Sequence, residues 1–114
     1  MIIIDLANSI VLYISLNSLS NQGSDKIEGL MLHSPNPITV QLHDKAFKKM
    51  KNLKFLMVRN VLISEGLKYL PNGLLLLEWD GYHFSLPDNY CPQQLVELKM
   101  PNSCISLEKL FKQV

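Results

Sequence analysis

The chain offers few residues whose spacing could support catalysis or metal binding. Cys91 and Cys104 are well separated and form no C-x-x-C pattern. The histidines form no H-x-x-x-H pattern near them. The three histidines are His33, His43 and His83. Two thiols without histidine partners are too few for a zinc site, and they are too few for a disulfide scaffold. We therefore expect buried, reduced cysteines, which suit a reducing compartment, with a bridge as the less favoured alternative.

Three residues with catalytic side chains, Asp80, His83 and Ser85, lie close together in the sequence. They raise the alternative of a hydrolase. Their spacing does not match a nucleophile elbow, and proximity in sequence is not the geometry that a catalytic triad requires. We favour a surface loop after a strand, and we expect the protein not to be an enzyme.

The composition fits one folded domain, or a piece of a larger one. The 114 residues are 47% hydrophobic and 18% charged, which argues against disorder. Eleven basic residues face ten acidic ones, so the net charge of +1 predicts no binding to nucleic acid or to a membrane surface. The basic run at Lys48, Lys49 and Lys51 has no interleaved aromatic residues, and we interpret it as a solvated face.

An L-x-x-L-x-L pattern recurs along the chain. It starts at Leu53, Leu74 and Leu95, which are equally spaced, and an earlier unit starts at Ile27, at a somewhat longer interval before Leu53. Leucine-rich repeats share this consensus and a length of roughly 20–29 residues. We therefore expect an α/β fold: a leucine-rich-repeat solenoid fragment with a parallel sheet on its concave face and short helices or irregular turns on its convex face. The four irregular repeats would span residues 23–114, with strands near 27–32, 53–58, 74–79 and 95–100.

The turn after each strand departs from the repeat consensus. An asparagine is expected eight residues after the first leucine, where its side chain would bond the turn backbone. The chain holds Pro35, Val61, Tyr82 and Ser103 at these places, and Asn60 lies one residue early. The repeats are therefore irregular.

The repeat also predicts which side chains share the concave face. Side chains alternate between the two faces of a strand, so the residues between the buried leucines point outward. The predicted protein-contact residues are Met31, His33, Phe55, Met57, Arg59, Leu76, Glu78, Asp80 and Lys99. In this register Arg59 should stand beside Asp80, Glu78 beside Lys99, and Phe55 beside Leu76 as an apolar spot.

Three segments interrupt or precede the repeats. Residues 1–22 form an apolar head and a polar linker, which we expect to lie outside the repeat fold; a signal or anchor segment is the less favoured alternative, because no basic residue precedes Lys26. Pro35 and Pro37 exclude a regular helix or a central strand around them. Asp44 is a suitable N-cap, and residues 44–51 are expected to form a short helix.

Several pieces of the sequence, in order, resemble one family. They are G-S-D-K-I-E-G-L from Gly23, V-Q-L at Val40, A-F-K-K-M-K-N-L at Ala46, L-P-N-G-L at Leu70, L-E-W at Leu77, L-P at Leu86 and P-Q-Q-L-V-E-L at Pro92. Together they resemble the start of the leucine-rich-repeat region in plant disease-resistance proteins of the TIR, nucleotide-binding, leucine-rich-repeat class. The resemblance covers residues 23–114.

The resemblance implies a protein-interaction module of an intracellular immune receptor, located in the cytoplasm or also in the nucleus. In such receptors the repeats hold the nucleotide-binding switch at rest and sense an effector or a host protein that it has altered. Met57, Arg59, Glu78 and Asp80 would dock on the receptor's own nucleotide-binding domain. The chain holds no G-x-x-x-x-G-K-[ST] loop, so no cofactor is expected, and ADP or ATP would bind that other domain. The alternative is a stand-alone truncated adaptor or decoy.

Overall fold

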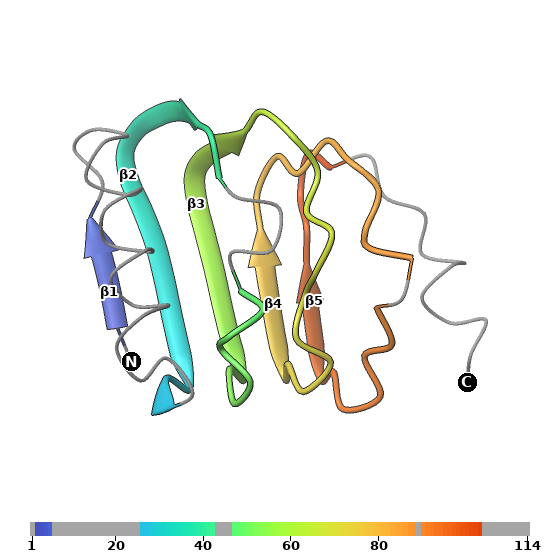
Figure 1. The fold of residues 1–114 in the computed structure, drawn as a ribbon. Helices are drawn as coiled ribbons and strands as arrows, with labels where there is room; N and C mark the ends of the chain where they lie inside the picture. Colours follow the sequence, from blue (N-terminus) through green and yellow to red (C-terminus); the bar gives the residue numbers. More distant parts are fainter. Residues whose placement is uncertain (1, 6–25, 43–46, 89, 104–114) are drawn as a thin grey trace.

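All described strands of the protein belong to one parallel sheet, ordered as they occur in the chain. The computed structural model describes residues 2–5, 26–42, 47–88 and 90–103. The strands are β1 (Ile2–Asp5), β2 (Gly29–Val40), β3 (Phe55–Ile63), β4 (Leu76–Trp79) and β5 (Glu97–Lys99), and neighbours in this order are hydrogen-bonded. Figure 1 shows them side by side, with the segments that return between strands crossing one face of the sheet.

The strand register aligns equivalent residues of successive units. Leu30 pairs with Leu56, Leu56 with Leu77, and Leu77 with Leu98. This is the register that the spacing of the four sequence units implies. β2, β3, β4 and β5 therefore each contribute one leucine to a row on the buried face of the sheet.

A repeated backbone contact fixes this register where the strands begin. The carbonyl of Glu28 accepts from the N–H groups of Lys54 and Phe55, at 2.7 and 3.1 Å. The carbonyl of Lys54 accepts from Leu75 and Leu76 at 2.7 and 3.1 Å. The carbonyl of Leu75 repeats the contact with Val96 and Glu97 at 2.8 and 3.1 Å. Successive units are therefore joined by the same two-to-one hydrogen bond.

The two prolines near the end of β2 coincide with a break in its pairing. His33 pairs with Arg59, whereas the next paired residue, Ile38, faces Val61. The expectation that Pro35 and Pro37 exclude a central strand is wrong, because β2 continues through both and lies between β1 and β3. The register shift between His33 and Ile38 accommodates them, since prolines within a strand are tolerated where the pairing is irregular. β2 resumes pairing beyond them and bends over the sheet at this end (Figure 1).

Turns rather than helices form the described return segments. The expected helix over residues 44–51 is only partly described: residues 43–46 lie outside the described residues, and residues 47–52 form successive turns. Met50 N donates to the Phe47 carbonyl at 3.1 Å and Leu53 N to the Met50 carbonyl at 3.2 Å. These i to i+3 bonds place Phe47, Met50 and Leu53 on one side, and all three are fully buried. The fold is thus a parallel sheet with almost no helix.

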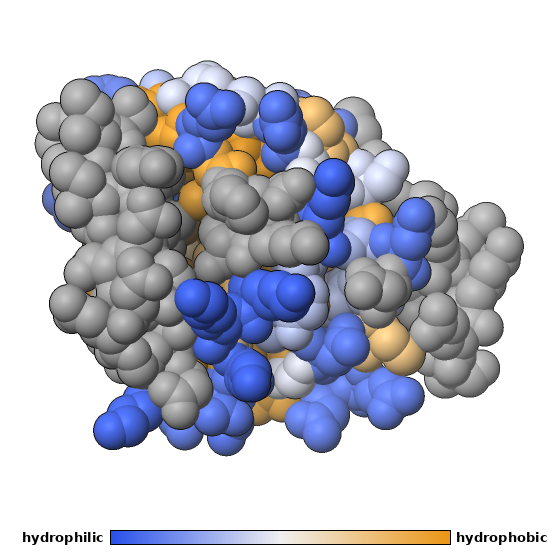
Figure 2. All heavy atoms as spheres, viewed as in Figure 1, coloured by the Kyte–Doolittle hydropathy of each residue, from blue (hydrophilic) through white to orange (hydrophobic). Residues whose placement is uncertain are grey.

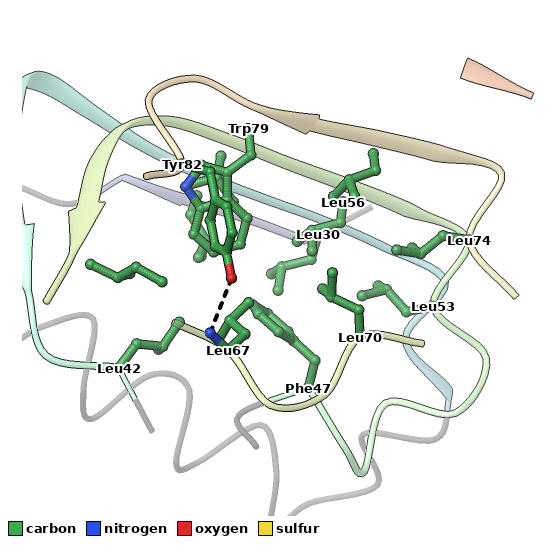
Figure 3. Packing of buried hydrophobic residues seen from close by; sticks show 14 of the residues in the cluster. Leu30, Leu42, Phe47, Leu53, Leu56, Leu67, Leu70, Leu74, Trp79 and Tyr82 are labelled. Atoms are coloured by element: carbon green, nitrogen blue, oxygen red, sulfur yellow. Dashed lines mark hydrogen bonds between the residues drawn. The ribbon is translucent and has the colours of Figure 1, made fainter. Parts of the chain in front are cut away.

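The core lies between the sheet and the return segments. Figure 3 shows side chains from both layers meeting there. The ring of Trp79 makes edge contacts with Phe47 and Tyr82, with ring centroids 6.4 and 5.2 Å apart. The largest fully buried side chains are Trp79, Tyr82, Phe47, Leu30, Leu32, Met50, Leu53, Leu56, Leu74 and Leu77. Aromatic residues therefore fill the space between the leucine rows and the turns.

Polar side chains link successive units beyond the row of buried leucines. Asn60 has a φ of 60°, and its Nδ2 donates to the Ser34 carbonyl at 3.0 Å. Ser103 Oγ accepts from Tyr82 N at 2.9 Å and donates to the Trp79 carbonyl at 3.4 Å. The side chains of Asn60 and Ser103 thereby bond the backbone of the preceding unit, although the units lack the regular asparagine.

The N-terminal strand differs from the sequence-based expectation for residues 1–22. β1 pairs with β2 in parallel, with Ile2 against Leu30 and Ile4 against Leu32. These four residues therefore extend the sheet by one strand. Residues 6–25 lie outside the described residues, so the expected polar linker is not described.

A buried hydroxyl connects the second return segment to the turn after β4. Tyr82 Oη accepts from the Leu67 backbone N–H at 3.1 Å and donates to the Ser85 carbonyl at 3.2 Å (Figure 3 shows the first bond). Burial raises the pKa of this hydroxyl, and the Leu67 N–H offsets part of the rise. Since Tyr82 is 1% exposed, loss of the hydroxyl would leave the Leu67 N–H buried and unpaired.

We predict that Tyr82→Phe lowers the free energy of unfolding by about 1–3 kcal/mol, the cost of an unsatisfied buried donor. Urea unfolding followed by circular dichroism measures the change. Tyr69→Phe, at a half-buried tyrosine, is the matched control and should change stability by less than about 0.5 kcal/mol. Equal effects of the two substitutions would contradict the assigned role of the Tyr82 hydroxyl.

Candidate protein-contact surface

The face of the sheet that points away from the core, here called the open face, carries the predicted contact residues. Along β3, Leu56 and Val58 are fully buried, whereas Phe55 and Arg59 are exposed and Met57 is half-buried between them. β4 alternates in the same way, with Leu77 and Trp79 buried. Side-chain alternation therefore separates the core from the open face in both strands.

An apolar patch spans four strands of the open face. Met31 pairs with Met57, and Phe55 pairs with Leu76. Ile3 of β1 extends the methionine row, because it pairs with Met31 and is 64% exposed. Phe55 is 37% exposed. We define the apolar patch as Ile3, Met31, Phe55, Met57 and Leu76.

The main ion pair of the open face differs from the one that the sequence predicts. Arg59 Nη2 donates to Glu78 Oε2 at 3.0 Å, on the neighbouring strand, in place of the expected Asp80. Lys99 lies beside Glu78 in the register, yet its Nζ contacts Glu97 of its own strand at 3.1 Å. The two expected pairs, Arg59 with Asp80 and Glu78 with Lys99, are therefore wrong as ion pairs.

The turn after β4 explains why Asp80 does not meet Arg59. β4 ends at Trp79, and the chain turns at Asp80 and Gly81, where Gly81 has a φ of 77° and donates to the Pro101 carbonyl at 2.9 Å. Asp80 Oδ1 accepts from Asn102 Nδ2 at 3.0 Å. The Asp80 carboxylate is thus held by the turn of the next unit, which leaves Glu78 as the acceptor within reach of Arg59.

At the same edge of the apolar patch as Arg59, His33 faces an acidic residue of β1. His33 Nδ1 lies 3.8 Å from Asp5 Oδ1, and the two residues pair in the register. The two polar pairs, His33 with Asp5 and Arg59 with Glu78, therefore lie along the same edge of the apolar patch, because His33 is the register partner of Arg59. Neither Ile3 nor Asp5 is among the predicted contact residues. The three consecutive isoleucines before Asp5 show no alternation of polar and apolar residues, so the sequence does not indicate which of these side chains faces outward.

Eight of the nine predicted contact residues lie on described strands. Asp80 is the exception, because it lies in the turn after β4. The register brings Met31, Met57, Glu78 and Lys99 into one row, and His33 and Arg59 into another. The structure thus places the predicted residues on neighbouring strands of one sheet.

The alternative catalytic group is not assembled by any described contact. Asp80 accepts from Asn102, and Ser85 uses its backbone carbonyl to accept from Tyr82. His83 is exposed, and within the described residues no hydrogen bond joins it to Asp80 or Ser85. The described part of the chain also contains no group of three or more His, Cys, Asp or Glu that could hold a metal ion. It has no helix long and apolar enough to cross a membrane.

We predict that a double-mutant cycle on Arg59→Ala and Glu78→Ala gives a coupling energy of about 0.2–1 kcal/mol, as is usual for exposed pairs. The coupling should shrink as salt is added, because both side chains are partly exposed. A cycle on Arg59→Ala and Asp80→Ala is the control. Thermal or urea unfolding measures both, and a larger coupling in the control would contradict the observed pairing.

Curated relatives match most of the chain. The chain is 40% identical over 100 residues to Disease resistance protein RRS1 and 36% identical over 102 residues to Disease resistance-like protein DSC1, both of Arabidopsis thaliana. The same plant's Disease resistance protein RPP2A is 35% identical over 102 residues. These alignments cover 78–82% of this chain and about 8% of each relative.

The chain therefore spans less than a tenth of the length of these relatives. No protein-family model and no solved structure matches it. The relatives nevertheless agree with the resemblance carried by the sequence pieces, and that prediction is confirmed. Over the matched stretch, the chain belongs to the plant disease-resistance proteins.

Proposed function

We propose that the chain is a non-catalytic protein-interaction module, formed by the first leucine-rich repeats of an intracellular plant immune receptor. Its open face would be the concave face of a solenoid and would contact another protein during defence signalling. The proposal places the protein in the cytoplasm, or also in the nucleus, and assigns it no cofactor, nucleic acid or membrane partner.

The apolar patch is the observation that carries this proposal. It combines apolar side chains from β1, β2, β3 and β4 on a face that points away from the core. Polar pairs border it, so a partner would meet an apolar centre with charged residues at its edge. Protein interfaces commonly have this arrangement, with an apolar centre and a polar rim.

The solenoid part of the proposal is supported by the repeated backbone contact. Three successive units use the same two-to-one hydrogen bond, at the carbonyls of Glu28, Lys54 and Leu75. Parallel strands in chain order and short return segments are typical of repeat proteins, in which each unit contacts its neighbours. Figure 2, in the same view as Figure 1, shows hydrophilic residues gathered over the lower half of this side and hydrophobic ones over part of its upper half.

Two classes of partner follow from the resemblance. The first is the receptor's own nucleotide-binding domain, with Met57, Arg59 and Glu78 in the contact. Asp80, held by Asn102, would lie at its margin. The second is a pathogen effector or a guarded host protein. We favour the nucleotide-binding domain, because the resemblance places this stretch at the start of the repeats, nearest the switch.

We predict that Phe55→Glu weakens binding of this chain to a purified nucleotide-binding domain of such a receptor about tenfold or more. The substitution would place a charge without a partner in the apolar centre of the contact. Isothermal titration calorimetry or biolayer interferometry measures the affinity. Gln41→Glu introduces the same side chain at an exposed position after β2 and is the matched control.

Thermal melts of both variants establish that they remain folded. If Phe55→Glu and Gln41→Glu bind as the unchanged chain does, the open face is not the contact surface. If the unchanged chain does not bind the domain at all, the docking role is wrong. The adaptor or decoy alternative is tested separately, by mapping the 5′ end of the transcript: an in-frame upstream phosphate loop would exclude it.

A further inference from the structure

One turn of the return segments carries an asparagine that is followed directly by a glycine. A turn precedes the leading leucine at equivalent positions in three units, at residues 51–52, 72–73 and 93–94. Where the second of these turns has Asn72, the other two have a lysine and a glutamine. Asn72 is also the one asparagine of the chain that a glycine follows. The second turn therefore differs from the others in its chemistry.

An asparagine side chain can react with the backbone nitrogen of the next residue, and asparagine is accordingly a thermolabile residue type. Here the Gly73 nitrogen would attack Cγ of Asn72 and form a succinimide ring. The bond from Cγ to Nδ2 breaks, and ammonia leaves with the proton of the Gly73 nitrogen. Water then opens the ring at either carbonyl. The product is an aspartate, or an isoaspartate in which the main chain runs through the former side-chain carbon.

The structure leaves this reaction unobstructed at the attacking nitrogen. Asn72 is exposed, and the Gly73 N–H donates to no acceptor among the described residues. A Cβ atom added to Gly73 would meet no heavy atom within 4 Å, so the space beside the nitrogen is open. The φ of Gly73 is not positive, and the equivalent residues, Asn52 and Gln94, have side chains. The fold therefore tolerates a side chain at position 73 and does not require glycine there.

A backbone N–H of the next unit holds the side-chain oxygen of Asn72. The Cys91 N–H donates to Asn72 Oδ1 at 2.8 Å. As the Gly73 nitrogen adds to Cγ, negative charge develops on Oδ1. A fixed N–H donor at that oxygen stabilises such a charge, as an oxyanion hole does. The contact between the two units therefore favours the addition step.

A second pair of the same kind shows the difference that the fold makes. Asp80 precedes Gly81 and could close the same ring. The Gly81 N–H, however, donates to the Pro101 carbonyl at 2.9 Å, and Asp80 Oδ1 accepts from Asn102 at 3.0 Å. A nitrogen whose N–H is bonded in this way must lose that bond before it attacks. The structure therefore favours Asn72 over Asp80 as the reacting residue.

We propose that Asn72 is a site of self-modification, at which Gly73 closes the succinimide ring and water opens it to aspartate or isoaspartate. The reaction needs no co-reactant except water. Each product places a negative charge in a turn that has none at Asn72, next to a contact between two units.

The two products act differently on that contact. An aspartate keeps an acceptor in place, and its charge strengthens the bond from the Cys91 N–H. An isoaspartate adds a carbon to the main chain and shortens the side chain, so its carboxylate no longer lies where Oδ1 of Asn72 lies. The added carbon also comes shortly before Leu75, whose carbonyl accepts the N–H groups of Val96 and Glu97. The isoaspartate therefore loosens the contact between β4 and β5, and the aspartate does not.

The test is peptide mapping by mass spectrometry of the full chain, incubated folded at neutral pH. Trypsin should release residues 69–99 as one peptide, since no lysine or arginine lies between its ends. We expect the mass gain of an amide that becomes a carboxylate, with fragmentation placing it at Asn72. An isoaspartyl methyltransferase should label the same position and not Asp80. Asn89, which Tyr90 follows in the same peptide, is the internal control and should stay unmodified.

Gly73→Ala should slow the mass gain about tenfold or more, because the methyl group hinders the attacking nitrogen and raises the barrier. Circular dichroism establishes that this variant folds. Hydrogen exchange then measures the consequence: the N–H groups of Val96 and Glu97 should exchange faster in the separated isoaspartate form than in the unmodified chain. Asn72→Asp, which keeps the acceptor, is the matched control and should leave their exchange unchanged.

Three results would overturn the proposal. The first is a folded chain that stays unmodified at Asn72 while the chain unfolded in urea converts. The second is a mass gain that Gly73→Ala does not slow. The third is an isoaspartate form in which Val96 and Glu97 exchange as they do in the unmodified chain.

The proposal does not depend on the proposed function, because Asn72 and Gly73 are not part of the apolar patch. A chain that is not modified would leave the binding test of Phe55→Glu unaffected, and the reverse also holds.

Discussion

The register between successive strands is the constraint on which the rest of the molecule depends. One carbonyl per unit, at Glu28, Lys54 and Leu75, accepts two N–H groups from the next unit and fixes that register at the start of each strand. Because side chains alternate with a period of two, the same contact determines which residues enter the core and which reach the open face. A slip of β3 by one residue would exchange Leu56 with Phe55 or Met57 in the core row, because each side chain of the slipped strand changes face.

Burial in this sheet comes from neighbouring units more than from any unit alone. The row from Leu30 to Leu98 shows this directly: its inner members are almost completely buried, and the last, which has a described strand on one side only, is half-buried. The return segments close the other side of the core with turns whose period of three residues aligns Phe47, Met50 and Leu53. Trp79 and Tyr82 then connect the sheet to those turns through edge contacts and a buried hydroxyl.

The sequence is informative where one rule, alternation in register, decides the outcome. The rows of the open face follow from the spacing of Leu53, Leu74 and Leu95, and eight of the nine proposed contact residues lie on the described strands. It is less informative where local geometry decides. The partner of Arg59 depends on where β4 ends. Asp80 accepts a hydrogen bond from Asn102 because of the turn after β4, and the spacing of the repeats does not predict that turn. Likewise, the N-cap and lysines of residues 44–51 favour a helix in isolation. In the fold, however, turns bury Phe47 and Met50.

The open face and the β5 edge make different demands on the surrounding chain. A partner on the open face contacts side chains only, so it leaves the backbone groups of the sheet as they are. A further repeat needs the backbone groups of β5. Continuation of the sheet by a further repeat would therefore use the β5 edge and leave the apolar patch accessible.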